Sequence, residues 1–349
     1  MKSSSVLVHT LLREHGLQPA TKSSGWTVFW TGTHLKSYVF QGLNKYQRIN
    51  QFPRSFELTR KDTLARNMTR MQQVHGERHF QFLPKSFVLP HDAAEFEATI
   101  RSMRGMPWIV KPAASAQGKG IYLTQFEEGV GVGDAVSVRD SSATVSMYIP
   151  NPLLLDGYKF DLRLYVAVTS MNPLRIYLHE EGLCRFATVP YDPDPSHYSN
   201  RFMHLTNYSI NKKSRKFVPG GDDGASGHKW SLPALKKRLA DDGVDVPRLW
   251  AAIHDLLIKT FIAIEGQVNA AMDMFVPHAA NCFELFGFDV LIDDTLQPWL
   301  IEVNFAPSLA CDADLDLRIK GRVVSDILNL AAVKPFDAKR EEGVARAKR

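Results

Sequence analysis

Aromatic and branched residues dominate the stretch Phe283-Glu-Leu-Phe-Gly-Phe-Asp-Val-Leu-Ile-Asp-Asp-Thr-Leu-Gln-Pro-Trp-Leu-Ile-Glu-Val-Asn304. Such residues favour strands, and Asp293-Asp294 with Pro298 is typical of a turn. The sequence therefore predicts a hairpin whose two strands are Phe286–Ile292 and Trp299–Asn304.

Two carboxylates face each other in this predicted hairpin. A register that is symmetric about the turn places Asp289 opposite Glu302 and Leu291 opposite Leu300, and Asn304 then shares a face with Glu302. Like charges at about 5 Å repel, so a bound cation would explain the pair. Two carboxylates and an amide oxygen are hard ligands that suit Mg²⁺. The alternative is a solvated hairpin face that holds no ion.

The composition is that of a soluble globular protein. The chain has 349 residues, of which 44% are hydrophobic and 23% charged, enough for two or three domains. No apolar run approaches the roughly 20 residues that span a bilayer, and the first residues lack a signal-peptide pattern. Three scattered cysteines favour a reducing cytosol. The net charge of +5 suggests an acidic partner: nucleic acid, anionic membrane or acidic protein.

A strand, a loop of small residues and a second strand are expected over Trp108–Leu123. Gly118 and Gly120 would let the backbone approach a ligand, and Lys111 and Lys119 could meet phosphate oxygens. The loop lacks the Walker A pattern, and the chain has no kinase catalytic loop. A plain glycine turn in a hairpin is the alternative.

Charges alternate along the predicted strand Gly157–Val168. Lys159, Asp161 and Arg163 point to one face, while the residues between them are apolar. Such a face indicates either a lined pocket or a solvated sheet surface. A guanidinium binds oxyanions with two parallel hydrogen bonds, which suits Arg163 to an anionic transferring group.

Six motifs follow one another in an order that resembles the tubulin tyrosine ligase-like family. They are Lys111-Pro112 with Gln117–Gly120, Lys159–Arg163, Arg185–Ala187, His204–Ser209, Phe286–Asp289 and Leu300–Asn304. The similarity runs from about Leu43 to Ala332, and the polyglutamylase branch, in particular its type-five members, is most similar.

The resemblance implies an α/β (α+β), ATP-grasp-like fold in which two sheet-containing subdomains hold a nucleotide. The domains expected are an N-terminal α/β subdomain (1–85), a central ATP-grasp subdomain with the glycine loop (86–145), a C-terminal ATP-grasp subdomain with the metal site (146–335) and a basic tail (336–349). The tail is either a solvated end or part of a basic partner-binding element.

The resemblance also implies a role for each matching residue. ATP would contact Lys111, Gln117, Gly118, the hinge Ser146, Met147, Tyr148 and Ile149, and then Lys159, Phe160, Asp161, Thr206 and Asn207. Mg²⁺ would be held by Asp289, Glu302 and Asn304. Arg163 and Gln117 would act in catalysis. Free glutamate would bind Arg185, Tyr208, Ser209, Lys229 and Lys320. His204 is predicted to be structural, because no nucleophile elbow or metal-binding histidine pair accompanies it.

The implied activity is ATP- and Mg²⁺-dependent ligation of free L-glutamate to glutamate γ-carboxylates through an acyl phosphate. The acceptors would be tubulin C-terminal tails or other acidic protein tails. The expected protein is a cytoplasmic monomer at the cytoskeleton, cilium or basal body, without nucleic acid or membrane partners. The alternatives are a tubulin glycine or tyrosine ligase of the same fold, and a non-catalytic nucleotide-binding module that docks on tubulin.

Three positions depart from the family pattern. Met147 stands where relatives often carry a basic residue, and Gln51 replaces a histidine in a region expected to meet the acceptor tail. Gln117 stands where type-five and type-four relatives have arginine and chain-elongating relatives have glutamine. This difference favours the hypothesis that the chain elongates existing glutamate branches. The family's cationic microtubule-binding extension is not recognised up to Arg349, so we expect weak microtubule affinity.

Overall fold

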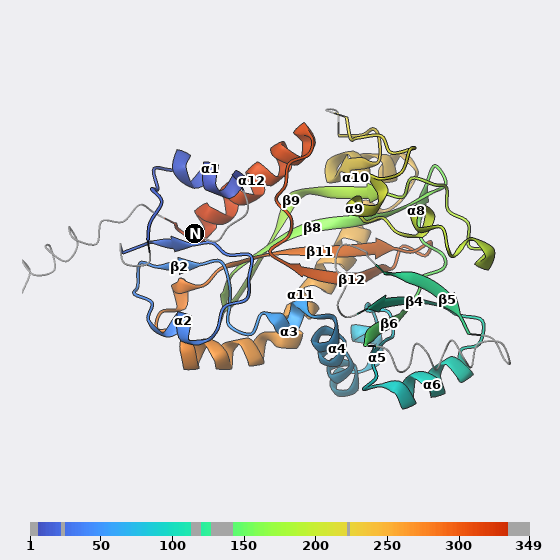
Figure 1. The fold of residues 1–349 in the computed structure, drawn as a ribbon, viewed down its shortest axis with the longest axis horizontal. Coiled ribbons are helices and arrows are strands. Elements are labelled where there is room, and N and C mark those ends of the chain that lie inside the picture. Colours follow the sequence, from blue (N-terminus) through green and yellow to red (C-terminus); the bar gives the residue numbers. More distant parts are fainter. Residues whose placement is uncertain (1–5, 22–24, 113–119, 127–141, 222–223, 334–349) are drawn as a thin grey trace, which may run out of the picture.

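The largest element is a six-stranded antiparallel sheet (Figure 1). The computed structural model describes residues 6–21, 25–112, 120–126, 142–221 and 224–333. Five strands run in the order β10-β9-β8-β11-β12, and β7 pairs with β8. Their bounds are β7 (Leu154–Leu155), β8 (Tyr158–Met171), β9 (Leu174–Phe186), β10 (Lys229–Ser231), β11 (Glu284–Ile292) and β12 (Pro298–Phe305).

A second antiparallel sheet of four strands has the order β3-β6-β4-β5. Its strands are β3 (Ser86–Leu89), β4 (Pro107–Pro112), β5 (Tyr122–Gln125) and β6 (Ala143–Met147). The boundary predicted between residues 145 and 146 falls inside β6, so the small sheet extends to Met147. Near the N-terminus, β1 (Val28–Phe29) and β2 (Arg48–Ile49) form a short parallel pair.

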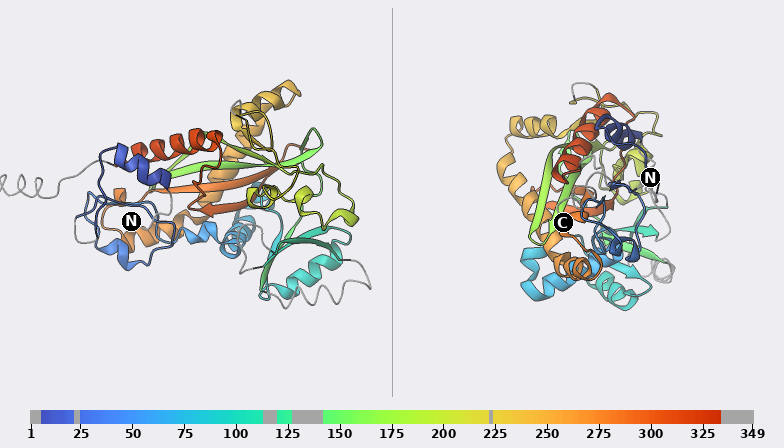
Figure 2. Two further views of the ribbon diagram at one scale, coloured as in Figure 1. Left: turned by 45° about the horizontal axis from the view of Figure 1, so that its top comes forward. Right: turned by 90° about the vertical axis from the view of Figure 1, so that its left-hand side faces the viewer.

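Helices pack on both faces of the large sheet and on one face of the small sheet (Figure 2). Their bounds are α1 (Val6–Glu14), α2 (Tyr38–Gln41), α3 (Phe56–Thr59), α4 (Lys61–His75), α5 (Glu77–Phe80), α6 (Ala93–Ser102), α8 (Arg201–His204), α9 (Tyr208–Asn211), α10 (Leu232–Asp241), α11 (Val246–Phe275) and α12 (Asp314–Leu330), with 3₁₀ turns at Pro195–His197 and Ala279–Asn281. Within the described ranges, none of these helices combines the length and apolar character needed to cross a membrane.

Strand periodicity assigns each face of the large sheet to a different helix. Phe286 and Phe288 of β11 point to one face, where their ring centroids lie 5.4 and 5.6 Å from that of Phe261 in α11. Leu285 points to the other face and packs in a core with α1 and α12, which includes Ile319. Further along this second face, the charged residues of β8 and β11 line a cleft.

The small sheet is organised in the same way. Trp108 and Val110 of β4 pack with Phe96 of α6, whereas Ile109 and Lys111 point to the opposite face. That second face lies across the cleft from the charged residues of the large sheet. In each sheet, alternation along the strands therefore places core residues on one face and cleft residues on the other.

The hairpin register is confirmed at its carboxylates and wrong nearer the turn. Asp289 is paired with Glu302, but Leu291 lies opposite Trp299 instead of Leu300. A bulge between Asp289 and Val290 gives β12 one extra residue, which shifts the pairing on the turn side. Bulges concentrate beside functional sites, where they change the direction of a strand.

Candidate active site

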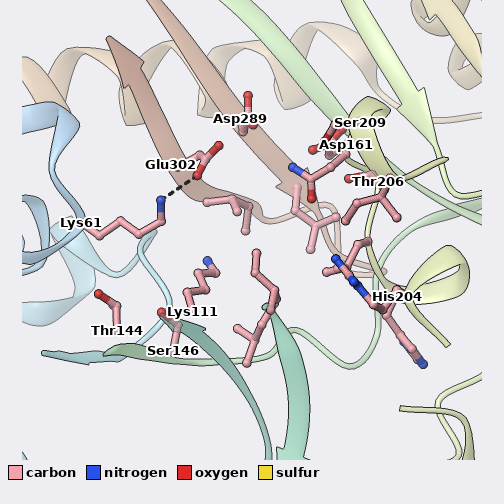
Figure 3. A pocket seen from close by; sticks show the side chains of 18 of the residues that line it. Lys61, Lys111, Thr144, Ser146, Asp161, His204, Thr206, Ser209, Asp289 and Glu302 are labelled. Atoms are coloured by element: carbon pink, nitrogen blue, oxygen red, sulfur yellow. Dashed lines mark hydrogen bonds and ion pairs between the residues drawn. The ribbon is translucent and has the colours of Figure 1, made fainter. Parts of the chain in front are cut away.

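A cleft of about 1460 Å³ lies between the two sheets (Figure 3). It brings together most of the residues that the sequence predicted for the site, from strands β4, β6, β8, β9, β11 and β12 and from the segment around α8 and α9. These are Lys111, Ser146, Met147, Tyr148, Ile149, Lys159, Asp161, Arg163, Arg185, Thr206, Asn207, Tyr208, Ser209, Asp289, Glu302 and Asn304.

Charged side chains form two rows across the large sheet. In one row, Lys229 pairs with Arg185, and Arg185 with Asp161. In the next, Asp289 pairs with both Arg163 and Glu302. Lys159 and Asp161 are only 5% and 6% exposed. The solvated sheet face that was the alternative is therefore wrong, and this face of β8 lines a pocket.

Asp289 is held by two arginines. Its Oδ1 lies 2.6 Å from Arg163 Nε, and its Oδ2 lies 2.9 Å from Arg185 Nη2. Arg185 also forms a buried ion pair with Asp161. Burial alone would raise the pKa of the Asp289 carboxyl, but the charges of Arg163 and Arg185 hold that pKa well below its ordinary value. Asp289 is therefore an anion at neutral pH.

The three predicted metal ligands present oxygen atoms from adjacent strands. Glu302 Oε2 lies 3.0 Å from Lys61 Nζ, and Asn304 Nδ2 donates to the Gly287 carbonyl at 3.2 Å. That bond uses the amide nitrogen, so the remaining acceptor of Asn304 is its oxygen. A carboxylate offers about four lone-pair positions, and Arg163 and Arg185 together make three contacts with Asp289, so about one acceptor position remains.

This donor set therefore fits a hard divalent cation. Among the described residues, no group of three or more His, Cys, Asp or Glu side chains could hold a metal, so a site here would need the Asn304 oxygen as its third ligand.

Two lysines face the cleft from opposite sheets, the half-buried Lys111 and the buried Lys159. Burial and the nearby charge of Lys61 together lower the pKa of Lys111 to about 8. Burial lowers the pKa of Lys159 to about 7, although the charge of Asp161 opposes this. A phosphate placed between them would favour their charged forms. The site thus prefers an anionic ligand.

The predicted glutamate site is divided. Arg185, Tyr208 and Ser209 line the cleft. Lys229 and Lys320 do not line it, because their ammonium groups lie 2.7 and 2.8 Å from the carboxylate of Asp316. Lys229 Nζ also lies 4.1 Å from the ring centroid of Tyr208, so the two parts touch.

Phe160 and Gln51 do not line the cleft, and three candidate residues lie outside the described ranges. The Phe160 side chain points into the core, 5.7 Å from the ring of Phe186, because it alternates with Lys159 and Asp161. Gln51 is buried, accepts a hydrogen bond from the Leu35 amide and contacts His34. Gln117, Gly118 and Lys119 lie outside the described residues.

Lys61 lines the cleft, and Asp316 pairs with Lys229 and Lys320 beside it; both residues were missed. Lys61 is the first residue of α4 and is separated by 241 residues from Glu302, so no local pattern reports their contact. Asp316 lies four residues before Lys320 on α12, a spacing that brings two side chains together. That spacing is a signal that could have identified the Asp316 pair.

Glu284 anchors the segment that leads into α3. Its Oε2 accepts a 2.8 Å hydrogen bond from the Phe52 amide, and its side chain is buried. Burial raises its pKa from 4.5 to about 8, even though the Phe52 amide opposes the shift. Between these pH values the unfolded chain loses this proton and the folded chain keeps it. Rising pH therefore destabilises the fold, by at most about 1.4 kcal/mol per pH unit.

We expect Glu284→Gln to remove this pH dependence, because the amide cannot ionise and its oxygen can still accept from Phe52. Urea unfolding from pH 5 to pH 8 should show the variant gaining stability relative to the parent as pH rises. A surface exchange, Glu77→Gln, should leave the difference constant. A parent and a Glu284→Gln variant with the same slope would contradict a neutral buried carboxyl group.

The fold and the cleft define an α/β protein in which two antiparallel sheets enclose a pocket of lysines, arginines and carboxylates. The model of the tubulin-tyrosine ligase family matches residues 41–341, and the chain belongs to this family.

Curated relatives extend this finding. The chain is 49% identical over 333 residues, 95% of its length and 24% of the relative's, to tubulin polyglutamylase TTLL5 of Mus musculus. It is 42% identical over 93% of its length, and 26% of the relative's, to tubulin monoglutamylase TTLL4 of Homo sapiens. It is 41% identical over its whole length, and 49% of the relative's, to tubulin polyglutamylase ttll-5 of Caenorhabditis elegans. The chain thus spans a quarter to a half of the length of these relatives.

Proposed function

We propose that the chain is an ATP- and Mg²⁺-dependent protein polyglutamylase of ATP-grasp type. The placement of Lys111 and Lys159 in one cleft with Asp289, Glu302 and Asn304 carries this proposal, because it joins phosphate-binding cations to a hard-metal donor set. The names of the relatives support glutamate as the added amino acid. The nucleotide would lie between the two sheets.

The residues of the cleft would have the following roles. Lys111 and Lys159 would bind phosphate oxygens, and the backbone of Ser146–Ile149 would border the base. Glu302, Asn304 and the remaining acceptor position of Asp289 would hold Mg²⁺. When bound, Mg²⁺ would neutralise phosphate charge. Arg163 lines the same cleft and would stabilise the phosphoryl group in transfer.

The reaction has two steps. A γ-carboxylate oxygen of the acceptor glutamate attacks the terminal phosphorus of ATP, which forms an acyl phosphate and releases ADP. The amine of free glutamate then attacks the acyl carbon, forms the amide bond, expels inorganic phosphate and loses a proton. Positioning and charge neutralisation are the main requirements, so no covalent enzyme nucleophile is needed.

The acceptor would be an acidic protein tail, with tubulin C-terminal tails as the first candidates. We expect the enzyme to act as a cytoplasmic monomer at the cytoskeleton, cilium or basal body. The cations around the cleft include Lys61, and the sequence carries a net charge of +5. Both features favour an acidic partner.

A donor screen tests the proposal. Acidic tail peptides incubated with ATP, Mg²⁺ and either glutamate, glycine or tyrosine should gain mass only with glutamate, because Arg185 and the nearby Lys229–Asp316–Lys320 group suit a dicarboxylic amino acid. Mass spectrometry reports the product. Addition of glycine or tyrosine would support the ligase alternative. ATP binding without any product would support the docking module.

Gln117 motivates an inference about the acceptor. We infer that the enzyme extends existing glutamate branches, since chain-elongating relatives resemble it at this position. Peptides with a branch glutamate should react faster than unmodified peptides, and Gln117→Arg should shift the rate ratio toward unmodified tails by about tenfold, the size of one charge-assisted hydrogen bond. Preference of the parent chain for unmodified tails would refute the inference.

A further inference from the structure

His204 lies at the centre of a buried cluster next to the proposed nucleotide site. It is 1% exposed, and three tyrosine rings surround it at centroid distances of 5.6 to 5.9 Å, all close to edge-on: Tyr148, Tyr191 and Tyr198. No step of the proposed reaction uses this histidine. Figure 3 shows it on the wall of the cleft, away from Asp289 and Glu302.

A chain of hydrogen bonds connects this cluster to Lys159. Lys159 Nζ donates to the Tyr148 hydroxyl at 2.8 Å. That hydroxyl lies 3.1 Å from His204 Nδ1, and His204 Nε2 lies 3.0 Å from the His197 carbonyl oxygen. The ammonium can only donate and the carbonyl can only accept.

These two ends determine the direction of every bond between them. The proton of a neutral His204 must be on Nε2, facing the carbonyl of His197, so Nδ1 accepts from the Tyr148 hydroxyl. The hydroxyl oxygen then accepts from Lys159. Burial, together with the charge of Lys159, lowers the pKa of His204 to about 4, which keeps the ring neutral as this arrangement requires.

We propose that Tyr148 and His204 are positioning residues, which hold the Lys159 ammonium group in place for a nucleotide before the nucleotide binds. The proposal rests on the proposed function and adds a role for the side chain of Tyr148, a hinge residue whose backbone is expected to border the base. Lys159 Nζ also sits 4.2 Å from the ring centroid of Tyr148 and 5.8 Å from that of Tyr191.

The physical advantage comes from the flexibility of lysine. Its four-carbon stem loses considerable rotamer freedom when a ligand fixes it, which weakens binding. Here the Tyr148 hydroxyl takes one of three ammonium donors and the two rings restrict the stem. Two donors remain for an anionic ligand in the cleft. The ordering of Lys159 therefore takes place on folding and not on binding.

The test measures nucleotide affinity directly, without turnover. Binding of N-methylanthraniloyl-ATP is followed by fluorescence in the parent chain, in Tyr148→Phe and in Tyr198→Phe. We expect Tyr148→Phe to weaken binding about tenfold, because one charge-assisted hydrogen bond is lost. Tyr198→Phe removes a hydroxyl from the same cluster but not from the Lys159–Tyr148–His204 chain, and should bind within twofold of the parent.

A pair of variants at His204 separates positioning from packing. Leucine and asparagine have similar size, but only asparagine offers an oxygen near the position of Nδ1. We expect His204→Leu to weaken binding about tenfold and His204→Asn less than threefold. Equal losses in both variants, or unchanged binding in Tyr148→Phe, would overturn this inference and leave the proposed function intact. Failure of the parent chain to bind the nucleotide would overturn both.

Discussion

Replacing Glu302 by glutamine is expected to lower the rate of glutamate ligation about a thousandfold. The exchange keeps the size of the side chain but removes its charge from the metal donor set on β11 and β12. A bound divalent ion contributes several kcal/mol of transition-state stabilisation, and a loss of about 4 kcal/mol corresponds to this factor. The measurement is the initial rate of mass gain on a tail peptide at saturating ATP.

The controls for this variant distinguish the metal from the ion pair. Glu302 contacts Lys61 at 3.0 Å, so Glu302→Gln weakens that pair as well. Lys61→Ala removes the pair without removing a ligand, and nucleotide affinity should still rise with added Mg²⁺. In Glu302→Gln this Mg²⁺ dependence should disappear. Equal ATP turnover in the parent and in Glu302→Gln would contradict the proposed ligase activity and favour the non-catalytic nucleotide-binding module.

The second large effect is on stability. We expect Asp289→Asn to lower the free energy of unfolding by about 3–5 kcal/mol, because removal of one partner leaves buried charge uncompensated. Asp289 pairs with the half-buried Arg163 and the buried Arg185 at 2.6 and 2.9 Å. Asp161 still accompanies Arg185 in the variant, whereas Arg163 loses the carboxylate that it contacts. Urea denaturation at pH 7 measures the change.

An exposed ion pair provides the matched control. Asp255 lies 2.6 Å from Lys259 on the surface of α11 and is 59% exposed. Water screens this pair, so Asp255→Asn should cost less than about 1 kcal/mol. The pKa of Asp289 lies below its ordinary value of 3.8 in the folded chain, so its contribution is present above that pH and is lost under more acidic conditions. Equal unfolding midpoints for the parent and Asp289→Asn would contradict the buried arginine clamp.

Local patterns predicted the parts of the site that lie within single strands. Alternation along β8 placed Lys159, Asp161 and Arg163 on one face, and the turn after β11 brought Asp289 opposite Glu302. Both predictions needed only the two-residue period of a strand and a short connection. The bulge beside Asp289 was missed, because a register that is symmetric about a turn contains no information about an extra residue.

Contacts between distant segments were beyond such reasoning. Lys229 and Asp316 are 87 residues apart, so no local pattern indicates that they contact each other and are not exposed to solvent. The divided glutamate site follows from the packing of α12 against the sheet, which brings Asp316 to Lys229, while Lys320 already contacts Asp316 within the helix. Gln51 was expected in a region that meets the acceptor tail. In the structure its side-chain amide contacts Leu35 and His34, in the segment between β1 and β2.

Sequence alone determined which residue types line the cleft, the faces of the strands that carry them, and the family, because these depend on short-range periodicity and on the order of motifs along the chain. Tertiary structure decided which charges are neutralised, which lysines reach the cleft and which tyrosine positions Lys159. Those outcomes depend on the distance between groups and on their burial, and burial exists only once the two sheets and their helices have packed together.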